Sequence, residues 1–189
     1  LNEWAGQPLP LSASCWIGST KGGDGELTFR LAGAVAAVKA AIPLMSSLVN
    51  ATELNSELAE DFWNDLREQK LGAFASLGTD QTLYRLALPA ACGPIAIPGA
   101  ADEIILEWHG QQRWIKASGD EPAFKAIKAI ANSHGGHATR FRQGANVDPS
   151  YQRFTLLSEQ AHSFALEAVQ ERLRSAFDPA GVFATKRLP

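Results

Sequence analysis

Hydrophobic and polar residues alternate in several short stretches of the chain, and this pattern predicts β-strands. Two of these stretches flank the segment KGGDG, whose glycines suit a tight turn, so we expect a first hairpin there. A second hairpin is expected around HGQQ, with Trp108 and Trp114 meeting near its end. The predicted strands are residues 14–20, 26–31, 82–88, 103–108, 113–117 and 137–141.

Apolar residues recur at three- and four-residue steps elsewhere, which predicts amphipathic helices. Pro43 should end or kink the first helix, because proline cannot donate the helical hydrogen bond. Asn55 and Asp120 are cap-type residues, and Asp178-Pro179 should end the last helix. The predicted helices are residues 33–45, 55–68, 120–134 and 154–177.

The resulting order is β-β-α-α-β-β-β-α-β-α with mostly short connections. Hairpins and short connections favour an antiparallel sheet, so we predict an α+β fold, ferredoxin-like, with helices packed on one face of the sheet. No stretch resembles a linker between domains. Residues 1–189 are therefore expected to form a single domain.

Composition narrows the possible partners. The chain has 189 residues, is 46% hydrophobic and 20% charged, and carries a formal net charge of −3. These values exclude a disordered chain and give no electrostatic footprint for nucleic acid. The two cysteines show no metal or disulfide spacing, and no signal peptide or membrane-spanning run is visible. We expect a soluble protein of a reducing cytoplasm.

Most candidate chemistry is weak. The KGGDG segment precedes a strand and not a helix, so it is read as a hairpin turn and not as a phosphate loop. His134 and His137 flank two glycines, but zinc needs a third ligand at a suitable spacing, and no metal site is predicted. Neither Cys15 nor Cys92 lies in a nucleophile motif, and Cys15 is expected in the core.

The arginines of the segment HATRF and its neighbour are more informative. Strand alternation predicts that Arg140 and Arg142 point to one face of the sheet, with His137 on the other. Two guanidinium groups on an open face would suit a small carboxylate or the negative charge of a cofactor. A solvated surface pair is an equally weighted reading.

Two motifs, FDPAGVF with the later Arg187 and GGHATRF, resemble the FAD-linked oxidases of the vanillyl-alcohol oxidase type. Within that group, the chain is similar to the E-subunit family of bacterial glycolate oxidases. The further segments that carry the similarity are QPLPLSASCW, DFWNDLREQKL, TLYRLALP and RWIKAS. The resemblance implies a C-terminal cap domain of a subunit whose N-terminal FAD-binding domain is absent from this chain.

The resemblance also implies partners and site residues. It implies an enzyme complex that oxidises a small 2-hydroxy acid, glycolate, to glyoxylate, with FAD in the full-length subunit, a homologous D subunit and an iron–sulfur F subunit. Such a complex would be cytoplasmic and could reach the inner membrane peripherally. Arg140 and His137 are the implied catalytic residues, and Phe183 and Arg187 the implied cofactor-binding residues.

The chain departs from the family pattern in two places. Residues 184–186 are Ala-Thr-Lys where the family has Asn-Pro-Gly, and GGHATRF lacks the Asp and Asn of the related D-subunit motif. Two other readings therefore stay open. One is a stand-alone α+β module that binds a ligand or a partner, and the other is a purely structural domain that docks other subunits.

Overall fold

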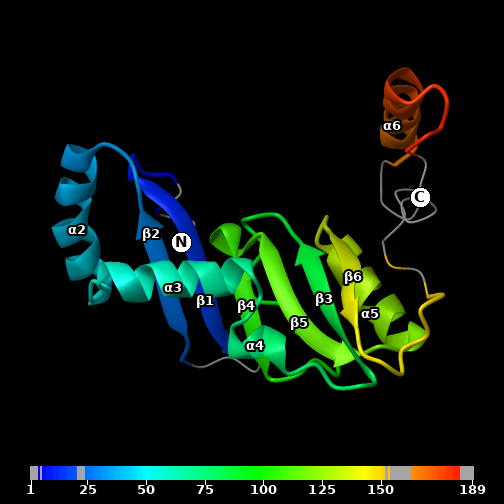
Figure 1. Cartoon of the computed structure of the whole chain (residues 1–189), viewed down its shortest axis with the longest axis horizontal. Helices are drawn as coiled ribbons and strands as arrows, with labels where there is room; N and C mark the ends of the chain where they lie inside the picture. The colour runs from blue at the N-terminus through cyan, green and yellow to red at the C-terminus, as the bar shows by residue number, and fades with distance from the viewer. Residues whose placement is uncertain (1–3, 5, 21–23, 152, 154–162, 184–189) are drawn as a thin grey trace.

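The computed structural model describes residues 4, 6–20, 24–151, 153 and 163–183, and it contains one six-stranded antiparallel sheet (Figure 1). The strand order is β2-β1-β4-β5-β3-β6. The strands are β1 (Leu11–Ser19), β2 (Glu26–Leu31), β3 (Gln81–Ala87), β4 (Glu103–Glu107), β5 (Gln112–Ser118) and β6 (His137–Gln143). The predicted α+β class and antiparallel sheet are confirmed.

Four of the strands have the ferredoxin-like order. Strand β3 pairs with both β5 and β6, and β4 pairs with β5, so the order β6-β3-β5-β4 is that of a split βαβ unit. Helix α5 (Glu121–Ser133) connects β5 to β6. A loop of residues 88–102 stands where a first crossover helix would be expected. The β1–β2 hairpin extends this unit by pairing β1 with β4.

The loop of residues 88–102 is fastened to the sheet by Arg113 on β5. Its side chain is almost fully buried and donates to the carbonyl oxygens of Cys92, Gly93 and Gly110. A buried guanidinium is costly unless its donors are paired, and here all three nitrogens have partners. Arg113 therefore ties the loop to β5, while Leu88 and Ile97 of the loop pack into the core.

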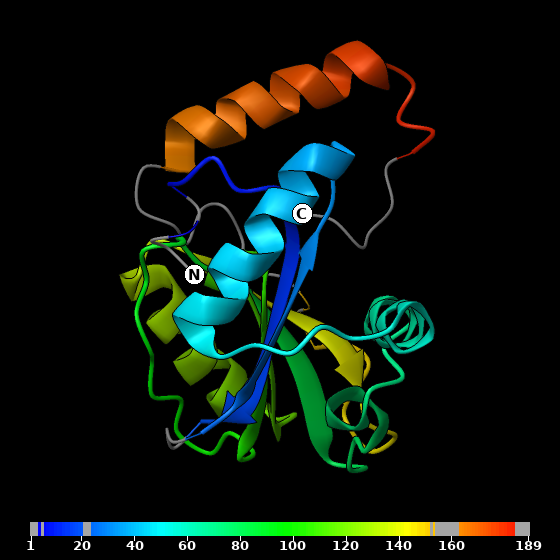
Figure 2. The same ribbon diagram turned by 90° about the vertical axis from the view of Figure 1, so that its left-hand side faces the viewer.

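Helices cover both faces of the sheet, whereas the sequence pattern suggested one. Figure 2 shows α5 on one side, and α3 (Ser56–Arg67) with α4 (Gly72–Ala75) on the other. The reason lies in β3 and β5, whose apolar residues point both ways. Tyr84 and Ile115 pack with Phe124 of α5, while Leu83 and Trp114 pack with Phe74 of α4.

The helix signals were read correctly at most ends. Asn55 and Asp120 cap α3 and α5, accepting from the backbone N–H groups of Leu58 and Ala123. Helix α2 (Val35–Val49) continues past Pro43, so the proline does not end the helix. It ends at Asn50, whose φ of 51° is left-handed and whose N–H bonds the Ser46 carbonyl.

The second hairpin differs from the prediction at its end. Trp108 does not meet Trp114, because Trp114 lies opposite Ile105 and packs edge-on against Phe74 and Phe141. Trp108 begins a short 3-10 turn, η1 (Trp108–Gly110), and is 65% exposed. Chain alternation alone does not foresee this turn, because Trp108 has a positive φ of 52°.

Helix α6 (Ser163–Phe177) lies away from the sheet (Figure 1). It ends before Asp178-Pro179, as predicted, while residues 154–162 of the predicted helix lie outside the described residues. Its apolar residues Leu166, Val169, Leu173 and Phe177 are each at least half exposed. In the described parts of the chain, no helix is both long and apolar enough to cross a bilayer.

Arg140 joins α5 to β6 and is the largest fully buried side chain among the described residues. Its guanidinium donates to the Glu121 carboxylate at 2.7 Å and to the Asp120 carbonyl at 2.9 Å. It also lies 4.3 Å from the centre of the Phe124 ring and 4.9 Å from that of Tyr151. This group of contacts binds the first turn of α5 to the sheet.

Replacing Arg140 by methionine should lower the free energy of unfolding by about 3 kcal/mol, because Glu121 and the Asp120 carbonyl lose a buried donor. Urea unfolding followed by circular dichroism measures this change. The matched control is Lys125→Met, which removes an exposed cation from the same helix and should change stability by less than about 0.5 kcal/mol. Equal unfolding midpoints for both variants would show that Arg140 does not bind α5 to the sheet.

Candidate functional site

One strip of the sheet carries polar side chains on the face that α3 and α4 share. The pairing places Glu107, Gln112, Ala87 and His137 in one row across β4, β5, β3 and β6. Arg85 lies in the next row, opposite Trp114 and Thr139. The row that contains Ala87 and His137 lies where β3 ends and β6 begins, which is the edge of the sheet away from α4 (Figure 1). We call Arg85, Glu107, Gln112, His137 and Phe141 the open strip.

A bulge in β6 builds the open strip. Leu83 pairs with Arg142 and Tyr84 with Arg140, which leaves Phe141 without a cross-strand partner. The extra residue turns Phe141 and Arg142 to the same face. The Phe141 ring packs edge-on against Trp114, with centroids 4.9 Å apart, and the Arg85 guanidinium lies 5.8 Å from its centroid.

The predicted pairing of Arg140 and Arg142 on one open face is wrong, because the bulge separates them. Arg140 points under α5, where its exposed fraction is 1%. Arg142 points the other way and donates to the Phe74 carbonyl of α4. With its fork occupied by Glu121 and Asp120, Arg140 holds helix and sheet together, and its catalytic role stays a prediction.

Two glycines before β6 place His137 in its row. Gly135 has a φ of 74°, which an L side chain rarely adopts, and it ends α5 as predicted. A Cβ on Gly136 would lie 2.1 Å from the Ala87 carbonyl oxygen. Only glycine allows β6 to approach β3 this closely at that point. The GGH part of the motif therefore sets the position of His137 opposite Ala87.

The charges on the open strip favour a neutral imidazole. Desolvation by the surrounding side chains lowers the pKa of His137 below its ordinary 6.5, and the nearby Arg85 guanidinium lowers this pKa further. Further along the row, on β4, the Glu107 carboxylate accepts from Trp114 Nε1 at 2.5 Å and from Gln112 Nε2 at 3.0 Å. Glu107 is thus held within the sheet, while Arg85 and His137 face outward.

This arrangement pairs an anion-binding group with a proton acceptor. Arg85 is half-buried, and a guanidinium in that setting can hold a carboxylate through two parallel hydrogen bonds. A neutral histidine one row away can accept a proton from a hydroxyl group of the same small molecule. The sequence interpretation identified His137 but missed Arg85. The signal was present, because strand alternation places Arg85 on the same face as Leu83 and Ala87.

The FDPAGVF segment forms a fixed turn beyond α6. Both oxygens of the Asp178 carboxylate accept backbone N–H groups, from Val182 at 2.7 Å and Phe183 at 2.8 Å. The turn exposes Val182 and Phe183 by 74% and 79%. The turn follows α6, which lies away from the sheet (Figure 1), and the cofactor-binding role of Phe183 stays a prediction. Arg187 lies outside the described residues.

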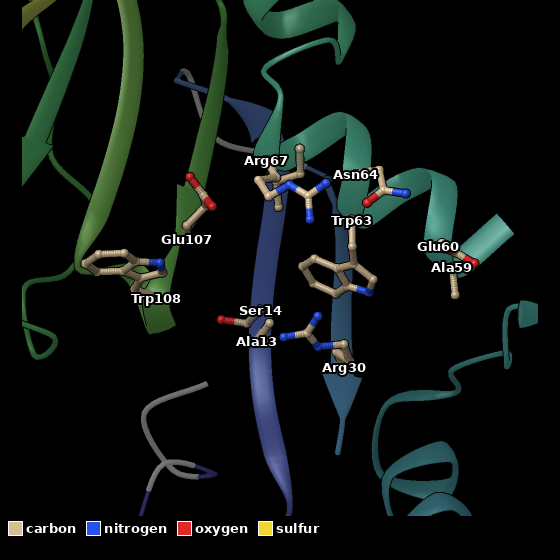
Figure 3. A pocket seen from close by; sticks show the side chains of 11 residues that line it. Ala13, Ser14, Arg30, Ala59, Glu60, Trp63, Asn64, Arg67, Glu107 and Trp108 are labelled. Carbon is tan, nitrogen blue, oxygen red and sulfur yellow. The ribbon is translucent and has the colours of Figure 1, made fainter. Parts of the chain in front are cut away.

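A second feature, which we call the α3 pocket, lies between α3, the β1–β2 hairpin and Trp108 (Figure 3). It has a volume of about 530 Å³. Trp63 and Trp108 lie on opposite sides of it, with Ala13 and Ser14 of β1 between them. Arg30 and Arg67 also line it. The sequence pattern did not predict this pocket.

The remaining candidates show no reactive arrangement. Cys15 is fully buried, as predicted, and burial raises the pKa of its thiol to about 12, with Glu107 and Glu26 adding to the shift. Among the described residues, no group of three or more His, Cys, Asp and Glu side chains is placed to hold a metal ion. His134 lies in the cap of α5, with its Nδ1 near the Ile130 carbonyl.

Comparison with known proteins finds a similar protein of known name. The chain is 34% identical over 186 residues to the glycolate oxidase subunit GlcE of Escherichia coli (strain K12), and the match covers 98% of this chain. The predicted resemblance to the glycolate oxidase E subunits is confirmed. The match covers 43% of GlcE, so the chain spans less than half the length of this relative. No family model and no solved structure matches the chain.

The effect of Arg85 on His137 can be measured directly. Replacing Arg85 by methionine should raise the pKa of His137 toward 6.5, because the positive charge that disfavours protonation is removed while partial burial is kept. Titration of the imidazole carbon-bound protons by NMR gives this pKa. Lys125→Met is the control and should leave it unchanged. An unaltered His137 pKa in the Arg85 variant would show that the Arg85 charge does not influence His137.

Proposed function

We propose that this chain is the cap domain of the FAD-dependent E subunit of a glycolate oxidase, part of a complex that oxidises glycolate to glyoxylate. The observation that carries the proposal is the 34% identity to GlcE along almost the whole chain. The open strip supports it, because an arginine and a neutral histidine on one exposed sheet face suit a small 2-hydroxy acid.

The chain fits one part of FAD and not another. The open strip offers a flat sheet face with an aromatic ring and a cation, which suits the polar edge of a flavin ring. A diphosphate needs a cradle of glycine amides at a helix start, and the described residues contain no such loop after a strand. We therefore assign the covering of the ring to this chain and the holding of the nucleotide to the rest of the subunit.

The residues of the open strip have distinct roles in this proposal. The Arg85 guanidinium binds the substrate carboxylate and fixes the orientation of its C2 carbon. The His137 imidazole, kept neutral by its surroundings, accepts the proton of the C2 hydroxyl. Phe141 and Trp114 form an apolar wall that limits water at the reacting carbon. The flavin supplies the acceptor for the hydride that leaves C2.

The electrons must then leave the subunit. We infer that they pass to a homologous D subunit and an iron–sulfur F subunit, in a cytoplasmic complex that reaches the inner membrane only through its partners. The described residues offer no cluster that could carry an electron on its own metal. In this proposal the flavin is held by the rest of the same subunit, and the D and F subunits take the electrons onward.

The exposed face of α6 favours this reading over a stand-alone module. A complete small domain rarely leaves a row of apolar residues such as Leu166, Val169, Leu173 and Phe177 uncovered. The chain corresponds to less than half of GlcE, so a large part of such a protein remains to cover this row. We propose that the remaining part of the subunit is the occupant.

Substitution of the two outward-facing residues tests the proposed chemistry in the intact complex. Arg85→Met should raise the KM for glycolate at least tenfold, because the carboxylate loses its charged partner. His137→Gln should instead lower kcat about 100-fold, since the proton acceptor is lost while carboxylate binding is kept. Steady-state glycolate oxidation with an artificial electron acceptor measures both constants.

The control for both substitutions is Lys125→Met, which should retain wild-type kinetics. Flavin content per subunit should be determined for each variant, so that loss of the cofactor is not read as loss of chemistry. Wild-type KM and kcat in both the Arg85 and His137 variants would show that the open strip takes no part in glycolate oxidation.

The role of α6 requires a separate test in the full-length subunit. Leu173→Glu places a charge in the apolar row and should cause loss of flavin or of soluble assembly, because the two parts of the subunit no longer pack. Glu171→Gln on the same helix is the control and should assemble normally. Size-exclusion chromatography with flavin absorbance gives the result, and normal assembly of the Leu173 variant would support the stand-alone reading.

A further inference from the structure

The α3 pocket is a second site, separate from Arg85 and His137. We propose that it binds a small planar molecule that carries negative charge, such as an aromatic carboxylate or the ring of a nucleotide. Its volume of about 530 Å³ falls within the usual range for small-molecule sites, roughly 300–1,000 Å³. Its walls combine indole rings with guanidinium groups, and this combination matches a flat anion.

Arg30 supplies a positive group that is already oriented. Its Nε donates to Ser12 Oγ at 3.0 Å, and its guanidinium carbon lies 5.4 Å from the centre of the Trp63 ring. Its two terminal nitrogens have no hydrogen-bond partner among the described residues. Because the side chain is fixed at one nitrogen and stacked on an indole, little conformational entropy is lost when the other two bind an anion.

The acidic residues of the pocket leave this positive charge available. Glu107 directs its carboxylate to Trp114 and Gln112 in the sheet. Glu60 lies at the outer edge of the pocket, whereas Arg30 and Arg67 lie near Trp63 (Figure 3). The part of the pocket beside the Trp63 ring is therefore cationic and aromatic at once.

Trp108 provides the opposite wall at an energetic cost. Trp108 and His109 both have left-handed backbone conformations, with φ of 52° and 57°. Residues other than glycine keep such backbone conformations only where neighbouring groups enforce them. Here the buried Ser14 hydroxyl accepts the His109 N–H at 3.1 Å and fixes the turn. The Trp108 indole is therefore kept exposed at the side of the pocket, where a ligand can contact it.

The two indoles and the arginine fork define the ligand class. A flat ring can lie against Trp63 or Trp108, and its negative group can reach the two terminal nitrogens of Arg30. An uncharged apolar molecule would leave the guanidinium unpaired, and a compact inorganic anion would leave the indole walls empty. Benzoate, AMP and FMN share the required chemistry and differ in the size of the ring and the type of anion.

The five tryptophans of the chain allow a direct test by NMR. Each probe is titrated into the ¹⁵N-labelled chain while the indole N–H signals are followed, with Trp63→Phe and Trp108→Phe used for assignment. We expect the signals of Trp63 and Trp108 to shift with a Kd below about 1 mM for at least one probe, while the Trp4 signal stays fixed. Binding of benzoate alone identifies a carboxylate, binding of AMP a nucleotide, and binding of FMN alone a flavin ring.

The variant Arg30→Met separates a built site from nonspecific stacking. It should weaken the binding of the active probe at least tenfold, whereas Lys125→Met should leave it unchanged. Unaltered signals of the other tryptophans show that both variants are folded. No shift with any probe, or equal binding by the Arg30 variant, would overturn the proposal. Neither result bears on the proposed oxidase function, because Arg85 and His137 lie outside the residues tested.

Discussion

The bulge at Phe141 in β6 determines which chemistry each face of the sheet presents. Without it, Arg142 would follow Arg140 under α5, and two guanidinium groups would compete for one acidic partner. With it, Arg140 alone meets Glu121, and Phe141 joins Trp114 on the other face. One extra residue in a strand of seven thus separates a structural arginine from the residues that face solvent.

The fold was largely readable from the sequence because its signals are local. These signals depend on neighbours within a few positions along the chain. They are the helix caps at Asn55 and Asp120, the glycine pair before His137 and the alternation of residues 82–88. The course of α2 beyond Pro43 was not readable, because a proline costs one hydrogen bond and nearby packing decides whether the helix resumes. Local signals predict where elements begin more reliably than how far they extend.

The site was harder to predict because it depends on long-range pairing. Arg85 and His137 are brought together only by the register of β3 against β6, which no local pattern contains. The bulge that turns Arg142 away is likewise a property of the pair of strands. Trp108 was expected to meet Trp114, and its exposure instead follows from a left-handed turn that Ser14 holds from another strand. The type of residue at these positions indicated the chemistry available, but the sequence did not indicate to which face each side chain points.

The way β1 joins the sheet has a consequence for the order of folding. Strand β1 pairs with β2, its neighbour in sequence, but it pairs with β4 only when Cys15 reaches Glu107, far along the chain. Closing so long a loop costs entropy before any contact is gained, so pairings of this kind form slowly. The unit of β3, β5, α5 and β6 can form first from nearer segments. We therefore expect the β1–β2 hairpin to add late, so that the α3 pocket, which β1 helps to line, is completed only after the rest of the sheet has formed.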